Sequence, residues 1–174
     1  MRVRAWLAAA VVLVTVAGCG DGAVDPKTWA RNVCTALKPW SSTISELTAR
    51  TQQQMASVTT AQQAKTSIVA LLDSEAKASE AARKKVVKAG VPDVSDGKRI
   101  AGQFTAALAS ARDAYATARD SIKQLSTSNA TSFYDGVSTA IDTMNKQYDA
   151  GKLDTSKVKS EDLQHAFDEV PQCQ

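Results

Sequence analysis

Apolar residues recur every three or four positions along most of the chain, a spacing typical of helices that bury one face. The clearest run lies in segment 97–125: Ile100, Phe104, Ala107 or Leu108, Ala111, Tyr115, Ala118, Ile122 and Leu125. Similar runs predict long helices over 26–57, 61–89 and 130–150, and a shorter one over 160–169. Four long helices with short turns predict an all-α fold, namely an antiparallel four-helix bundle with a short extra C-terminal helix.

Residues that satisfy free backbone groups mark the ends of these helices. They are Asp25 with Pro26, the capping box Thr60-x-x-Gln63, Gly90 with Pro92, Ser95 or Asp96, and Ser160. Pro39 lies inside the first helical run, where proline removes a donor and clashes one turn back. We therefore expect a kink or break at Pro39, with Thr43-x-x-Glu46 capping a restarted helix.

The first residues follow a different pattern. Arg2 and Arg4 give a positive start, Ala5 to Ala17 form an apolar run, and small residues precede Cys19. This order predicts a secretory signal peptide, because the apolar run is shorter than the roughly 20 residues of a permanent membrane helix. An uncleaved signal anchor is the alternative. The predicted organisation is a signal peptide over 1–18, a tether over 19–25 and a helical domain over 26–174.

The residues Val16-Ala17-Gly18-Cys19 resemble the lipobox of bacterial lipoproteins. The resemblance implies that the Cys19 thiol receives diacylglycerol and becomes the N-terminus after cleavage. Two acyl chains would anchor the protein stably, whereas one binds only marginally. Ordinary cleavage and full secretion is the alternative, and it leaves the Cys19 thiol without a role.

Two further cysteines, Cys34 and Cys173, are then available for one disulfide in an oxidising compartment. A bridge would close a loop of about 140 residues and stabilise the fold by at most about 5 kcal/mol in the chain-entropy model. Two free buried thiols are the alternative. A zinc site is disfavoured, because two cysteines and one histidine do not complete a four-ligand site.

The net charge and the length of the chain limit the classes of partner and the number of domains to be expected. The net charge is +3, and removal of residues 1–18 takes away Arg2 and Arg4 and lowers it to +1. No strong basic excess remains, which argues against nucleic acid as a partner. The length suits a single helical domain after cleavage.

Candidate chemistry is sparse. His165, the only histidine, has acidic residues three or four positions away on the same predicted helix, which suggests half a metal site or a solvated surface histidine. No P-loop or nucleophile-elbow motif occurs, and the three Ser-x-x-Lys matches lack their catalytic companions. We therefore predict a protein that is not an enzyme, with no cofactor and no bound metal.

Tryptophan and lysine provide the remaining candidates. Trp29 and Trp40 lie on either side of Cys34 in the sequence. We expect them either to pack in the core beside a disulfide or to line a site for a ligand or partner. A carrier pocket would lie near Trp29, Trp40 and Tyr115. Three lysines near the end of the second helix suit its dipole and would alternatively contact anionic lipid or wall polymer: Lys84, Lys85 and Lys88.

The layout as a whole resembles small, alanine- and threonine-rich helical lipoproteins of high-GC Gram-positive (actinobacterial) bacteria. Its shared features are the lipobox, the segment from Trp29 to Cys34, and the late Pro171-Gln172-Cys173. The resemblance implies a lipid anchor at the outer face of the cell membrane. We expect a non-enzymatic binding or interaction module of the cell envelope, with an envelope protein or cell-wall polymer as partner. A small-molecule carrier or sensor with a pocket between the helices is the alternative.

Overall fold

The computed structural model describes residues 22–153, 158 and 160–174, so the predicted signal peptide and Cys19 lie outside the described residues. The chain is all-helical there, in agreement with the predicted fold class. The helices are α1 (Pro26–Met55), α2 (Ala61–Lys88), α3 (Gly97–Gln124), α4 (Ala130–Gly151), α5 (Glu161–Glu169) and the 3-10 turn η2 (Pro171–Cys173). None of the described helices is long and apolar enough to cross a membrane.

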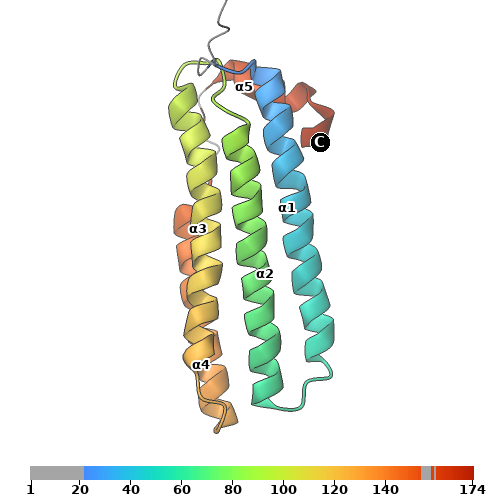
Figure 1. Cartoon of the computed structure of the whole chain (residues 1–174), viewed down its shortest axis with the longest axis vertical. Helices are drawn as coiled ribbons and strands as arrows, with labels where there is room; N and C mark the ends of the chain where they lie inside the picture. Colours follow the sequence, from blue (N-terminus) through green and yellow to red (C-terminus); the bar gives the residue numbers. More distant parts are fainter. Residues whose placement is uncertain (1–21, 154–157, 159) are drawn as a thin grey trace, which may run out of the picture.

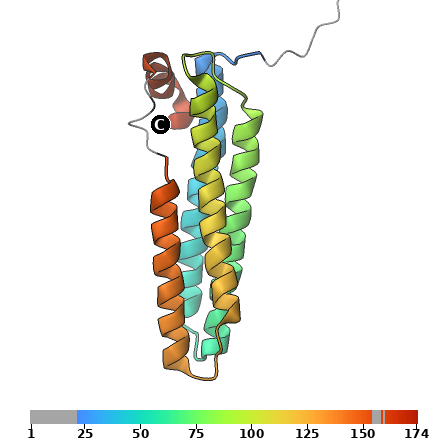
Figure 2. The ribbon, with the colours of Figure 1, turned by 90° about the vertical axis from the view of Figure 1, so that its left-hand side faces the viewer.

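The four long helices lie side by side as an elongated bundle (Figures 1 and 2). α2 packs against both α1 and α3, and α4 packs mainly against α3. α5 and η2 cover one end of α1. This order leaves α1 and α4 without direct backbone contact: in the described residues, no Cα atom of one lies within 8 Å of a Cα atom of the other.

Local capping explains most helix boundaries. The Asp25 side chain accepts a hydrogen bond from the Thr28 N–H at 2.9 Å, and the Thr60 hydroxyl accepts one from Gln63 N–H at 3.2 Å. Gly90 follows α2 with a φ of 79°, the left-handed conformation that favours glycine after a helix. Asp96 stands at the start of α3 but makes no side-chain cap, and its carboxylate pairs with Arg99 at 3.1 Å instead.

The expected break at Pro39 is wrong, because α1 continues from Pro26 to Met55. Proline removes only one backbone hydrogen bond, and Pro39 is exposed, so water can reach the freed carbonyl. Ala36, Leu37 and Trp40 pack into the core on either side of it and hold the helix together. Thr43 lies in the interior of α1 and does not begin a second helix.

The core has two main parts. Near the α5 end, Trp29 meets Phe104 edge-on, with ring centroids 5.3 Å apart, and Phe167 completes the aromatic cluster. Towards the other end, Leu72, Ile122 and Phe133 form the centre of a second cluster, and Trp40 packs against both. A third, smaller cluster lies around Ala30. The residues of the three clusters all fall between Val24 and Cys173 in the sequence.

Cys34 and Cys173 are brought to disulfide distance, as predicted. Their Cα atoms lie 5.1 Å apart although the residues are 139 positions apart in sequence. Leu163 and Ala166 of α5 are buried and add an apolar contact in the same region. The cysteine pair thus links the C-terminal segment to α1.

Candidate functional site

An apolar cleft lies on the side of the bundle where α1 and α4 stand apart. Its volume is about 310 Å³, near the lower end of the roughly 300–1,000 Å³ typical of ligand pockets. Helices α1, α3 and α4 and the residues just after α4 supply its lining: Leu37, Trp40, Phe104, Ala107, Leu108, Ala111, Tyr148, Lys152 and Leu153. The lining is apolar apart from Tyr148 and Lys152, so the arrangement suits an apolar group.

The sequence of α3 explains the space. Phe104 and Leu108 point into the core and are almost completely buried. Ala107 and Ala111 lie on the cleft side of the same helix. The side chain of alanine is too small to fill the gap to α4. The cleft therefore exists because small residues occupy α3 where α1 and α4 do not meet.

Trp40 forms one wall of the cleft and is held in place by polar contacts to α2. Its indole N–H donates to the Ser79 hydroxyl at 3.1 Å, and Ser79 in turn donates to the Glu75 carbonyl at 2.9 Å. Since the polar edge of the ring is satisfied by α2, its apolar surface is left to line the cleft. Trp40 is thus a preorganised apolar wall.

Trp29, the other predicted tryptophan, has a different place. It is fully buried, and its indole N–H donates to the Gly90 carbonyl at 2.9 Å. It lies against Phe104 behind the cleft and does not line it. The structure therefore separates the predicted pair into a core residue, Trp29, and a cleft residue, Trp40.

A buried carboxyl group lies deeper in the bundle. Glu75 is only 4% exposed, and burial raises its pKa to about 7, although a hydrogen bond with the Thr48 hydroxyl at 3.0 Å opposes the shift. That hydroxyl also lies 2.9 Å from the Ile44 carbonyl. Because a hydroxyl has one proton, a protonated Glu75 can donate to Thr48 while Thr48 donates to Ile44.

Two tyrosines connect this region with the cleft. Tyr115 packs against Tyr148, with ring centroids 6.3 Å apart, and Tyr148 lines the cleft. Burial, then the nearby charge of Glu75 and the neighbouring Tyr148, raise the pKa of Tyr115. Tyr115 itself belongs to the core, so of the three predicted pocket residues only Trp40 lines the hollow.

The other candidates are not brought together into a site. His165 is exposed on α5, and no group of three or more His, Cys, Asp or Glu residues arranged for a metal occurs within the described part of the chain. Lys84, Lys85 and Lys88 are exposed along the end of α2. Among large apolar side chains of the described residues, only Val87 on α2 and Tyr134 on α4 are exposed, at 53% and 45%.

Comparison with known proteins gives no relative. No protein-family model matches the chain, and no curated protein and no solved structure shows significant similarity to it.

Proposed function

We propose that this protein is a lipoprotein at the outer face of the cell membrane, anchored through Cys19, and that its helical domain is a non-enzymatic binding module. Its domain is best described as an antiparallel four-helix bundle with a short C-terminal helix, opened on the side between α1 and α4. The cleft on that side is the binding site. The supporting observation is its preformed apolar lining around Trp40.

The cleft favours a small molecule, or an apolar group of a larger one, as ligand. An envelope protein held by apolar contacts would need a contiguous exposed patch, and Val87 and Tyr134 lie on different helices, α2 and α4. A cleft of about 310 Å³ has room for a ring system or a short aliphatic chain. This geometry supports the carrier or sensor form of the binding function.

A cleft-filling variant tests the assignment. Ala107→Phe places a ring in the cleft, whereas Ala106→Phe adds the same ring at an exposed position of α3. Binding of an uncharged naphthylamine dye is followed by its fluorescence and by energy transfer from the two tryptophans near the cleft, Trp40 in its wall and Trp29 behind Phe104. We expect saturable binding to the unmodified protein, weakened about tenfold or more by Ala107→Phe and less than about twofold by Ala106→Phe, since a tenfold loss corresponds to about 1.4 kcal/mol.

Two results would count against the cleft as the binding site. One is the absence of saturable dye binding to the unmodified protein. The other is an equal effect of the two phenylalanine variants, which would place the dye elsewhere.

The anchor is tested separately, in cells fed a labelled fatty acid. The label should enter the unmodified protein and be absent from Cys19→Ala, because the proposed acyl chains are attached to the Cys19 thiol. Label retained by Cys19→Ala would contradict the anchor and leave the cleft assignment untouched.

A further inference from the structure

Charged residues are distributed unevenly over the five helices. Together, α1, α2 and α3 carry fifteen Lys and Arg residues and six Asp and Glu residues. α4 and α5 carry one lysine and seven acidic residues. The domain is close to neutral as a whole, yet it has a basic side on α1–α3 and an acidic side on α4 and α5.

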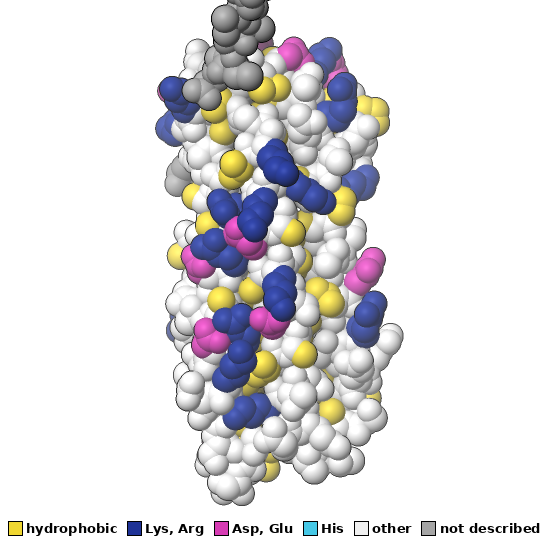
Figure 3. Space-filling model, viewed as in Figure 1, with side chains coloured by type: hydrophobic (Ala, Val, Ile, Leu, Met, Phe, Trp, Pro, Cys, Tyr) yellow, Lys and Arg dark blue, Asp and Glu magenta, His cyan; other side chains and the backbone are white. Residues whose placement is uncertain are grey.

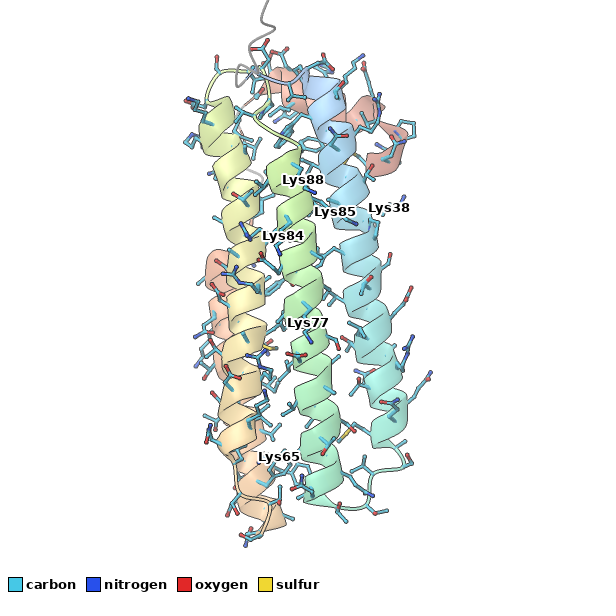
Figure 4. All side chains as sticks on the ribbon, in the orientation of Figure 1. Lys38, Lys65, Lys77, Lys84, Lys85 and Lys88 are labelled. Atoms are coloured by element: carbon cyan, nitrogen blue, oxygen red, sulfur yellow. A yellow bond between two sulfur atoms is a disulfide. The ribbon has the colours of Figure 1, made fainter. Side chains whose placement is uncertain are left out.

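Lysines form a row along the basic side. Figure 3 shows Lys and Arg side chains gathered over α2 and α3, and Figure 4 shows the lysines of α2 with Lys38 of α1 beside them. Lys77, Lys84 and Lys88 are separated by seven and four residues, so they share the outward face of α2. The row lies along the C-terminal half of α2 and consists of Lys77, Lys84, Lys85 and Lys88, whereas Lys65, near the start of α2, donates to the Leu125 carbonyl at 2.7 Å.

The acidic residues on this side are largely neutralised within the domain. Asp73 pairs with Lys77 at 2.6 Å and with Arg119 at 2.9 Å, and the Glu80 carboxylate is shared by Arg83, Arg112 and Lys84. Glu75 is buried. The excess positive charge therefore faces solvent.

An excess of positive charge lies near the C-terminal end of α2. Lys85 and Lys88 make no ion pair with any of the described residues. They border a shallow hollow between α1 and α2 whose lining also includes Asn32 and Thr35. Two ammonium groups beside an amide and a hydroxyl are donors that suit phosphate oxygens.

The chain enters the domain at this same end. The Val24 N–H donates to the Val91 carbonyl at 2.7 Å, and the Asp93 N–H donates to the Val24 carbonyl at 2.8 Å, so Val24 is fixed to the loop that follows α2. The five residues from Val24 back to Cys19 span at most about 18 Å when fully extended. A lipid on Cys19 would therefore keep Lys85 and Lys88 close to the membrane surface.

We propose that the α1–α3 side, centred on Lys77, Lys84, Lys85 and Lys88, docks onto the anionic phospholipid headgroups of the membrane. The choice of a membrane over a soluble polyanion rests on the proposed anchor at Cys19. A broad basic side suits a surface, and each lysine near an anionic leaflet strengthens binding about fivefold. The cleft is lined by α1, α3 and α4 and not by α2, so docking through α2 leaves it open to solvent.

Vesicle co-sedimentation tests the proposal without the lipid. The chain from Gly20 onward contains every residue of the core clusters and lacks Cys19. Two kinds of vesicle are compared, one of phosphatidylcholine alone and one with about 30% phosphatidylglycerol. We expect binding to the anionic vesicles only, lost at about 0.5 M NaCl because salt screens exposed charges.

Matched variants separate a defined surface from net charge. Lys85→Gln with Lys88→Gln lowers the net charge by two and should weaken vesicle binding about 25-fold, at about fivefold for each lysine. Asn145→Asp with Gln147→Glu lowers the net charge equally on exposed positions of α4 and should weaken it less than about threefold, because those positions lie away from the lysine row. Circular dichroism checks that all variants keep the same helix content.

Three outcomes would overturn the proposal. They are equal binding to both kinds of vesicle, equal weakening by the two double variants, and binding to soluble polyphosphate without binding to anionic vesicles. The last result would assign the surface to an anionic polymer. None of them bears on dye binding in the cleft or on labelling of Cys19.

Discussion

The α2–α3 seam and the opposite side, between α1 and α4, differ in how far they are closed. Along the seam, α2 and α3 bury apolar residues over nearly their whole length, and Arg112–Glu80 and Arg119–Asp73 pairs, each at 2.9 Å, bridge the helices at the surface. On the other side, α1 has buried residues only up to Ala36, and α4 buries only Phe133 and Ala140. The cleft lies where both outer helices keep half-buried apolar residues.

The difference teaches that the buried core and the proposed binding cleft belong to different helix pairs. The α2–α3 seam supplies a continuous core, so α1 and α4 need not meet for the domain to fold. Residues such as Leu37 and Tyr148 keep apolar surface partly exposed in the cleft. Such surface is available for a ligand because it is not used to join the helices.

Truncation of one side chain in the seam and one at the cleft should give the largest difference in the free energy of unfolding between the two sides. Ile122 is fully buried in the seam, and Ile122→Ala should lower the free energy of unfolding by about 3–4 kcal/mol through lost burial and a cavity. Leu37 is half-buried at the cleft, and Leu37→Ala should cost about 1 kcal/mol. Urea unfolding at one pH measures both values. Equal losses would show that the two sides are closed to the same degree.

Replacement of Glu75 should increase the free energy of unfolding by an amount that depends on pH and is similar in size to the loss expected for Ile122→Ala. The pKa of Glu75 is raised from 4.5 to about 7, so the unfolded chain ionises first and stability falls as the pH rises from about 4.5 to about 7. At 1.36 kcal/mol for each pKa unit, Glu75→Gln should be about 3 kcal/mol more stable, relative to the unmodified protein, at pH 8 than at pH 4.

The control for Glu75 is Glu46→Gln, which changes an exposed carboxylate on α1. Urea unfolding at pH 4, 6 and 8 should show a difference below about 0.5 kcal/mol for this variant. If Glu75→Gln showed no trend with pH, the carboxyl group would be ionised in the folded protein without a penalty.

Helix positions could be predicted from the sequence because their signals are local. Asp25, Thr60, Gly90 and Ser160 act within one turn of the backbone, and the structure places each beside the helix end that it marks. Pro39 failed as a signal because the packing of its neighbours outweighs one missing hydrogen bond. Local preference decides a boundary only where tertiary contacts do not oppose it.

The cleft could not be predicted in the same way. Periodicity shows which face of a helix turns inward, but it does not show whether the inward faces of α1 and α4 meet. Trp29 and Trp40 both follow a lysine by two positions in α1, and only the tertiary structure shows that Trp29 is a core residue and Trp40 a cleft residue. The alanines at 107 and 111 were the available signal, because small residues on an inward face leave space unless a neighbour fills it.

Removal of one ion pair on each side should give the smallest difference in stability between the two sides. Arg119 is 21% exposed and bridges Asp73 of α2, so Arg119→Gln should destabilise the protein by less than about 1 kcal/mol and by less again at about 0.5 M NaCl. Lys152 pairs with Asp149 at 3.3 Å near the cleft, where both side chains are about two-thirds exposed, and Lys152→Gln should have no measurable effect on stability. Thermal unfolding at two salt concentrations measures both variants. A loss for Arg119→Gln that does not shrink with salt would mean that contacts of the aliphatic part of the arginine, and not its charge, stabilise the seam between α2 and α3.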